Sequence, residues 1–358
     1  MFLKKSSWTY LILPFISSIL FFSCGPDYEA DIAEVEINLD IKRTDSLMGA
    51  GMRAFQRNPD LEVMAAYQTY LKQDKAFWFE YIGLADRFGE DTPEEVQDSL
   101  IAVNIGGLIA DPRLLELMDS VVKVFPEGYD FEAAISPVLK RFTLIFPEVG
   151  LPAFRTHVNG YIPDADFSYV DQIVSVPGYI SFGLHYFLGE TFSFYPPTIP
   201  QFVKRRFQPD YMEVVLAKEI AEQVVGPIDF RQNRALLDNM VHTGIKQYLV
   251  GELIPHQPDS VKLFYTTSQM EWAEYYEQAV YKEIIDVLYD SDFKLQQEYL
   301  GEKPYTTSLS MESAPRLGQF TGWKIVESYM KNHPEVSVAD LCAMTDYQLI
   351  FRESRYKP

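Results

Sequence analysis

A short apolar run near the N-terminus, from Trp8 to Phe22, determines where the rest of this chain folds. Two lysines precede the run, and Ser23-Cys24 ends it. It is shorter than the roughly 20 residues that a membrane-spanning helix requires, and a small residue stands before the cysteine. The pattern predicts a lipoprotein signal peptide over residues 1–23, with cleavage before Cys24 and lipidation of Cys24. An ordinary secretory signal with an incidental cysteine is the alternative.

Lipidation of Cys24 would anchor the protein to a membrane without spanning it. Cys342 is then the only other cysteine, so an oxidising compartment brings no disulfide framework. The fold must rest on its core. About 310 residues follow the tether, and 47% of the chain is hydrophobic, which suffices for one large domain.

The formal net charge is −20, and it becomes −22 when the signal peptide with Lys4 and Lys5 is removed. A surface this acidic repels phosphate backbones and anionic lipid headgroups. The charge therefore excludes nucleic acid as an expected partner, and it leaves proteins and small ligands. Beyond the lipid anchor, no membrane binding is expected.

Three segments are expected along the chain. Residues 1–23 form the signal peptide, and residues 24–50 carry the lipidated cysteine and an acidic tether with a possible edge strand at Glu36–Ile41. The acidic stretch reads as a solvated linker, or alternatively as a signal for export to the cell surface. Residues 51–358 are expected to form a single domain that is helical over 51–140, contains a sheet over 141–190, and returns to helices over 210–358.

Helical periodicity and capping residues indicate most of the expected helices. Asp111-Pro112 is a typical helix start, Thr92-Pro93-Glu94-Glu95 suggests a capped start, and Ser268 with Glu271 suggests a capping box. The expected helices begin or run at 61–71, 92–101, 112–122, 131–139, Met212–Val225, Arg231–Val250, Ser268–Leu288, Arg316–Asn332 and Val338–Met344.

Alternating apolar residues predict the sheet. Phe142, Leu144 and Phe146 alternate with their neighbours and suggest a first strand. The further predicted strands cover Arg155–Tyr161, Asp171–Val176 and Tyr179–Tyr186. The order of helices, sheet and helices indicates a helix-dominated α+β class with a small mixed sheet.

One helical stretch, Glu213–Glu222, has the spacing of a zinc-peptidase motif without its histidines. In such a motif, His-Glu-x-x-His places two imidazoles on one helical turn with the glutamate as general base. Here Lys218 and Glu222 stand at the two histidine positions, and Glu219 stands at the glutamate position. On the residues alone, an exposed Lys–Glu ion pair on a solvated helix face is the preferred interpretation.

The remaining residues give little sign of catalysis. The five histidines, among them His185 and His242, have no metal-ligand spacing, and no nucleophile elbow or phosphate-binding loop is present. His185 is expected to be a core residue. Gly318 and Gly322 are expected to allow close packing of helices. The many tyrosines around 179–195 and 265–289 should line the core or a groove, and exposed ones would suit a protein interface.

Several separated motifs of the second half resemble the gliding-motility lipoprotein family GldB. The resemblance covers roughly residue 140 to the C-terminus, together with the signal at Cys24. The motifs are Tyr186-Phe-Leu-Gly189, Tyr195-Pro196, Ile199–Phe207, Gly244-x-x-x-Tyr248 with Pro255, Gln269-Met-Glu-Trp272, Ser313–Gly318, Gly322–Met330 and Ile350–Pro358.

The resemblance implies a cell-envelope lipoprotein needed for surface gliding in bacteria that use type IX secretion. The family is also similar to zincin-like predicted metallopeptidases, which implies a degenerate zincin-like core. By that similarity, the zinc ligands would fall on Lys218, Glu222 and Thr243, and only Glu219 matches the motif. No metal, cofactor or catalytic residue is therefore expected. Lys218 is expected to pair with Glu219 and Glu222 and to place a fixed cation where a metal would lie.

These features predict a non-catalytic scaffold or protein-binding module, anchored in the cell envelope, whose partners are envelope or gliding-machinery proteins. It would face the periplasm from the inner or outer membrane, or lie on the cell surface. Two alternatives remain: a hydrolase with unconventional residues such as Glu219, and a chaperone for secreted adhesins.

Overall fold

The computed structural model describes residues 32–60, 74–81, 88–89, 91–161, 170, 172–228 and 234–358. The chain divides into two units, residues 1–34 and 35–358, of which the second is described below. Cys24, the predicted signal peptide and the predicted helix at 61–71 lie outside the described residues. The second unit includes residues that the sequence assigned to the tether, so the folded part begins before residue 51.

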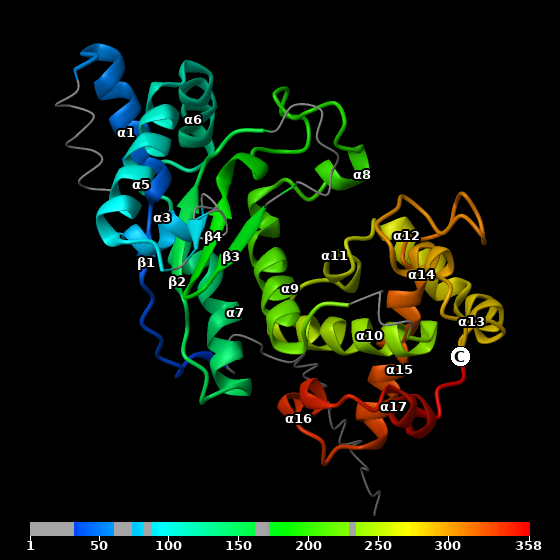
Figure 1. Cartoon of the computed structure of the whole chain (residues 1–358). Coiled ribbons are helices and arrows are strands. Elements are labelled where there is room, and N and C mark those ends of the chain that lie inside the picture. Colours follow the sequence, from blue (N-terminus) through cyan, green and yellow to red (C-terminus); the bar gives the residue numbers. More distant parts are fainter. Residues whose placement is uncertain are drawn as a thin grey trace, which may run out of the picture. The chain divides into compact units, whose positions relative to one another are not determined.

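The first part of this unit is helical (Figure 1). Asp111 caps one helix as predicted, since its carboxylate accepts a hydrogen bond from the backbone of Arg113. The predicted cap at Thr92 is wrong, because that hydroxyl donates backwards to Phe88 and Gly89, and the helix begins at Glu94. The helices are α1 (Thr44–Arg57), α3 (Lys75–Tyr81), α5 (Glu94–Ala110), α6 (Pro112–Val124) and α7 (Phe131–Ile145).

The predicted strand around Phe142 does not exist, because these residues continue helix α7. Ile135, Val138, Leu139 and Phe142 are buried along one helical face. An alternation of only five residues fits a strand locally, but the longer helical period decides the structure. The first strand after α7 is consequently β2, which begins at Ala153 and not near residue 141.

The sheet is small and mixed, with the order β1-β2-β4-β3. Strands β1 and β4 pair parallel to β2, and β3 pairs antiparallel to β4. Successive residues of β2 and β4 are buried, so both faces of these strands are covered. Of the predicted edge strand at Glu36–Ile41, only Ile41 lies in a strand, which it forms together with Lys42. The strands are β1 (Ile41–Lys42), β2 (Ala153–His157), β3 (Ile173–Val176) and β4 (Tyr179–Gly183), followed by the 3₁₀ turn η4 (Leu184–Tyr186).

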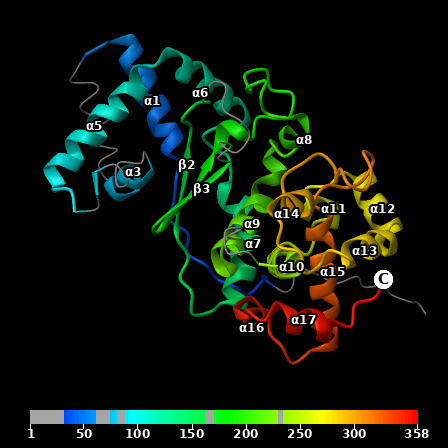
Figure 2. The same cartoon turned by 45° about the vertical axis from the view of Figure 1, so that its right-hand side comes forward.

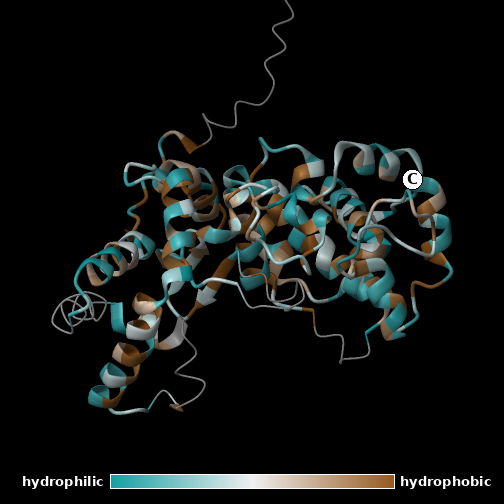
Figure 3. Cartoon of the chain, turned by 90° about the horizontal axis from the view of Figure 1, so that it is seen from above, coloured by the Kyte–Doolittle hydropathy of each residue, from teal (hydrophilic) through white to brown (hydrophobic). Residues whose placement is uncertain are grey.

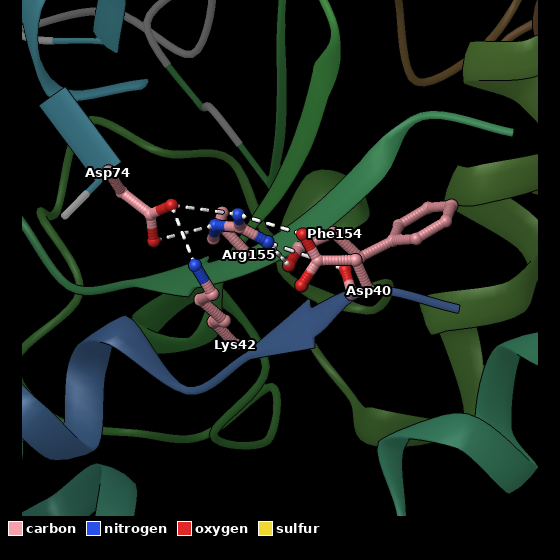
Figure 4. A network of polar contacts seen from close by, with 5 residues as sticks. All are labelled: Asp40, Lys42, Asp74, Phe154 and Arg155. Atoms are coloured by element: carbon pink, nitrogen blue, oxygen red, sulfur yellow. Dashed lines mark hydrogen bonds and ion pairs between the residues drawn. The ribbon is translucent and has the colours of Figure 1, made fainter. Parts of the chain in front are cut away.

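A buried arginine holds β1 and the start of α3 to the sheet (Figure 4). The guanidinium of Arg155, whose side chain is 1% exposed, donates to both carboxylate oxygens of Asp74 at 3.0 and 3.1 Å. It also donates to the carboxylate of Asp40 at 3.2 Å and to the carbonyl of Phe154 at 2.7 Å. Lys42 adds an ion pair to Asp74 at 2.9 Å. The network joins three segments that are distant in the sequence.

The last part of the unit is again helical (Figure 2). Met212–Val225 forms a helix with the predicted bounds. The predicted long helix from Ser268 is wrong: two shorter helices take its place, and the capping box is made by Thr266 and Gln269. The helices are α8 (Gln201–Lys204), α9 (Met212–Val225), α10 (Leu236–Leu253), α11 (Asp259–Lys262), α12 (Thr267–Tyr275), α13 (Glu277–Ile285), α14 (Phe293–Leu300), α15 (Leu317–Asn332), α16 (Val338–Ala343) and α17 (Tyr347–Ser354), with the 3₁₀ turn η5 (Pro209–Tyr211) before α9.

Helices α10 and α15 approach closely because glycines line their contact. A Cβ atom on Gly322 would lie 1.9 Å from the carbonyl oxygen of Met240, and one on Gly244 would lie 2.3 Å from that of Gly322. Any side chain at these positions would collide with the opposite backbone. The close helix packing predicted for Gly322 is confirmed.

The fold is a helix-dominated α+β structure with a small mixed sheet, as predicted. Most buried apolar residues form one continuous core that runs from α1 to α17. Figure 3 shows hydrophobic and hydrophilic stretches alternating along the helices, as expected when each helix buries one face. Within the described residues, none of the helices has the length and apolar character needed to cross a membrane.

Candidate functional site

A cavity of about 370 Å³ lies against helices α9 and α10. Its size falls in the range of small-ligand pockets, and its wall combines an apolar part with several long polar side chains. Three of the four residues singled out in the sequence, Lys218, Glu222 and Thr243, line it. The complete lining is Lys218, Ala221, Glu222, Pro227, Ile228, Thr243, Lys246, Gln247, Val250, Leu300 and Gln319.

Helix periodicity explains why these residues meet. Lys218 and Glu222 are one turn apart on α9 and therefore share a face. Helix α10 packs against α9 and presents Thr243, Lys246 and Gln247 to the same space. The placement of Lys218, Glu222 and Thr243 around one position thus follows from two helices whose existence the sequence predicted.

Glu219 lies elsewhere. Its carboxylate accepts a hydrogen bond from the hydroxyl of Ser175 on β3 at 2.5 Å and another from the amide of Gln223 at 2.9 Å. It does not belong to the cavity wall. The one residue that matches the zinc-peptidase motif therefore ties α9 to the sheet and is not positioned beside Lys218 as a base.

The predicted pairing of Lys218 with Glu219 and Glu222 is wrong. The ammonium of Lys246, from α10, binds the carboxylate of Glu222 at 2.6 Å. Lys218 instead donates to the amide oxygen of Gln247 at 3.2 Å and lies 4.6 Å from the ring centre of Phe264. Its side chain is half-buried, so the exposed-pair interpretation is wrong as well. Both Lys218 and Glu222 therefore have their partners on the neighbouring helix α10, and not on their own helical turn.

Two arginines stand behind Lys218, and the sequence analysis missed both. The guanidinium of Arg206 lies 4.5 Å and that of Arg316 lies 6.0 Å from the Phe264 ring centre. Both bind Glu302, at 2.9 and 3.0 Å. Three cationic side chains thus surround one ring, and only one carboxylate, Glu302, pairs with them among the residues described.

These neighbours change the ionisation of the group. Burial, followed by the positive charges of Arg316 and Arg206, holds the pKa of Lys218 well below its ordinary value. Burial alone would raise the pKa of Glu302, but the charges of Arg316 and Arg206 outweigh it and lower that pKa. These surroundings therefore disfavour the ammonium form of Lys218 and favour the ionised carboxylate of Glu302.

The backbone is strained at two residues of this cluster. Phe264 has a φ of 56° and Arg316 has a φ of 49°, both in the left-handed region that non-glycine residues rarely adopt. Such conformations cost on the order of 1–3 kcal/mol each and are concentrated at functional sites. Here they occur at Phe264, whose ring lies 4.6 Å from the Lys218 ammonium, and at Arg316, whose charge lowers the pKa of Lys218.

The residues of the cavity do not fit a zinc ion. Lysine and threonine stand at two of the three ligand positions that the zincin similarity implies, and the third, Glu222, is held by Lys246. In the described part of the chain, no three histidine, cysteine, aspartate or glutamate side chains gather as a metal site would require. No chemical step is therefore derived through a metal.

The other titratable candidates are core residues. Burial raises the pKa of the Cys342 thiol to about 12, which leaves it inert. His185 is fully buried, as expected of a core residue, and burial lowers its pKa to about 3. His242 is fixed between the hydroxyl of Tyr347 and the carbonyl of Gly226, both at 2.9 Å. None of the three borders the cavity.

A signal for the missed residues was present in the sequence. Arg206 and Arg316 lie inside two of the motifs on which the family resemblance rests, and Gln247 lies inside a third. The sequence did not predict that Arg206 and Arg316 both lie beside the ring of Phe264, a residue outside these motifs.

The comparisons with known proteins agree with the resemblance drawn from the motifs. The family model described as gliding motility protein GldB matches residues 26–358, which is nearly the whole chain. Neither a curated protein nor a solved structure matches it. The chain belongs to the GldB family of gliding motility proteins.

Proposed function

We propose that this protein is a lipid-anchored, non-catalytic binding module of the cell envelope that supports gliding motility linked to type IX secretion. The proposal rests on one observation: the side chains at the positions of a metallopeptidase motif are all bound to other residues of the cavity wall or of the helix. Glu222 is neutralised by Lys246, Lys218 is bound to Gln247, and the hydroxyl of Thr243 donates to the carbonyl of Asn239. A cavity with these residues can hold a ligand, and its one carboxylate is paired with an ammonium group and is not free to act as a base.

The rival reading, a hydrolase that uses Glu219 as a base, has less support. The carboxylate of Glu219 is engaged by Ser175 and Gln223 and does not reach the cavity. A general base must lie within hydrogen-bond reach of the group that it deprotonates. The zincin-derived origin of the core remains part of our proposal.

Substitution of Glu219 separates the two readings. Glu219→Gln removes the base and retains an amide oxygen that can accept from Ser175. In a strain whose own copy is deleted, we expect this variant to restore gliding as well as the wild type does. Loss of gliding by a variant that is folded and present at normal levels would overturn the non-catalytic proposal.

A second set of residues supports protein binding. Tyr275, Tyr289 and Phe293, on or beside α12–α14, are 81%, 69% and 58% exposed. Exposed aromatic side chains of this kind are frequent anchors of protein interfaces. A photo-crosslinking amino acid at position 275 should capture an envelope protein in cells, whereas the same amino acid at Val103, on α5 and 75% exposed, should not.

The anchor is tested at Cys24. Cys24→Ala should abolish acyl labelling and move the protein from the membrane fraction to the soluble fraction. If the variant stayed in the membrane fraction, a retained signal helix or a protein partner would hold it there, and the lipid-anchor prediction would fail.

A further inference from the structure

The cavity at α9 and α10 contains an imbalance of charge. Within its wall, Lys218 and Lys246 face one carboxylate, Glu222, which already pairs with Lys246. Immediately behind Lys218, Arg206 and Arg316 share the single carboxylate of Glu302. The two groups together hold four basic and two acidic side chains, in a chain whose net charge is −20. An excess of basic groups in so acidic a protein calls for an anionic ligand.

One buried polar atom of the cavity wall also lacks a hydrogen-bond partner. Gln247 is 1% exposed, and its amide nitrogen has no hydrogen-bond partner. Its amide oxygen accepts from both Lys218, at 3.2 Å, and the amide of Gln319, at 3.0 Å. A buried donor without a partner carries a free-energy cost, and an incoming acceptor would remove it.

The rest of the wall determines the kind of anion. Five lining residues are apolar: Ala221, Pro227, Ile228, Val250 and Leu300. A phosphate or sulfate group would leave this surface without contacts. A carboxylate on a short aliphatic stem matches both the polar and the apolar lining residues. Its oxygens can accept hydrogen bonds from Lys218 and Gln319, while its stem packs on the apolar side chains.

We propose that the cavity is a binding site for a carboxylate carried on an aliphatic stem, with Lys218 as its principal cation. The proposal deepens the proposed function, because it names the ligand chemistry of the same cavity. A bound carboxylate supplies the negative charge that Lys218 lacks, since Lys218 donates to the neutral amide of Gln247 and, among the described residues, to no carboxylate. The ligand is either a small organic acid or the C-terminal carboxylate of a polypeptide.

The test uses hexanoate as the probe and hexanamide as its uncharged match, observed by NMR titration against the chain from residue 25 onwards. That chain contains the whole compact unit, residues 35–358. We expect saturable binding of hexanoate and at least tenfold weaker binding of hexanamide, because a charge-assisted hydrogen bond is lost. Equal binding of the two probes, or binding of neither, would overturn the proposal.

Two variants place the site. Lys218→Met should weaken hexanoate binding about tenfold or more, whereas the control Lys282→Met, at an exposed lysine on α13, should leave it unchanged. Gln319→Glu places a carboxylate permanently at the same position and should abolish binding while the protein stays folded. This second variant decides the matter if Lys218→Met does not fold. Undiminished hexanoate binding by Gln319→Glu would show that the site lies elsewhere.

A peptide arm distinguishes the two sources of the carboxylate. The probe Ala-Ala-Leu is titrated as the free acid and as the C-terminal amide. Tighter binding of the peptide acid than of hexanoate assigns the site to a polypeptide C-terminus, and the reverse order assigns it to a free organic acid. These measurements on purified protein do not depend on gliding, so the carboxylate site and the proposed function can fail separately.

Discussion

Lys218 illustrates how a single side chain changes its chemistry with its surroundings. On an isolated helix it would be an ordinary solvated ammonium that pairs with Glu222. In the fold, α10 supplies Lys246 to Glu222, and Lys218 is left between a cavity and two arginines. The pKa of Lys218 is lowered as a result, because burial beside like charges removes hydration from the ammonium group and no carboxylate of the described residues pairs with it directly.

Lys218 should therefore react as a free amine at a lower pH than other lysines do. Acetic anhydride modifies only the neutral amine, and mass spectrometry of peptides measures the extent at each lysine. As pH rises, modification of Lys218 should reach its plateau well before that of a lysine in an unstructured reference peptide, whose pKa is about 10.4. Coincident pH profiles for the two lysines would contradict the lowered pKa.

At the scale of the element, the contact between α10 and α15 depends on glycine. Gly322→Ala should destabilise the protein by about 3 kcal/mol or more, since its Cβ would overlap the carbonyl of Met240 and the helices would have to separate. The matched control is Gly251→Ala. Gly251 lies in α10, and a Cβ atom there would meet nothing within 4 Å. That change should stabilise by up to about 1 kcal/mol through helix propensity.

Chemical denaturation of the two glycine variants provides the comparison. Equal midpoints for Gly322→Ala and the wild type would mean that the helices can move apart without cost. Destabilisation by Gly251→Ala would show that helix α10 tolerates no added methyl group, and the argument from close approach would lose its specificity.

The network around Arg155 makes a second prediction at this scale. Asp74→Asn removes the charge that binds Arg155 through two oxygens, and it leaves a buried guanidinium with Asp40 as its remaining carboxylate partner. Breaking one side of a buried pair costs about 3–5 kcal/mol. The control is Asp119→Asn, which breaks an exposed pair with Arg53 and should cost less than about 1 kcal/mol. Similar losses in the two variants would mean that the buried network adds no stability.

The elements show which features could be predicted from sequence. Helix α9 was predicted with correct bounds because its periodicity extends over 14 residues and Gly226 ends it with a φ of 89°. The strand predicted at Phe142 failed because a five-residue alternation is compatible with either structure. The capping box was placed at Ser268 although Thr266 and Gln269 make it, since both pairs have the required spacing and only the backbone distinguishes them.

On the scale of the whole molecule, the candidate site assembles residues from separate parts of the chain. Arg206 follows α8, Phe264 follows α11, Glu302 follows α14 and Arg316 precedes α15. Each of these residues is locally unremarkable, and no spacing relates them. The sequence therefore predicted the helices that carry Lys218 and Thr243, but not the basic cluster, whose assembly depends on tertiary packing alone.

The whole molecule should also lose stability in mild acid because several histidines are buried in neutral form. Burial lowers the pKa of His185 to about 3, burial and nearby Lys246 lower that of His242 to about 4, and burial lowers that of His157 well below its ordinary value. In the unfolded chain these groups titrate near the ordinary value of about 6.5. The unfolded state therefore binds more protons, and the stability present above pH 6.5 declines as pH falls towards 4.

His185 and His242 should each cost about 1.5–2 kcal/mol between pH 7 and pH 5, and His157 should add to this loss. Denaturant unfolding at pH 7, 6 and 5 measures it. In His242→Gln the slope of the unfolding free energy against pH should shrink by about one proton between pH 6 and pH 5. Carboxylates titrate mainly below this pH range. Where some of them are protonated, the smaller negative charge reduces repulsion and raises the free energy of unfolding. Stability that stayed constant from pH 7 to pH 5 would therefore mean that the buried histidines take up protons inside the fold.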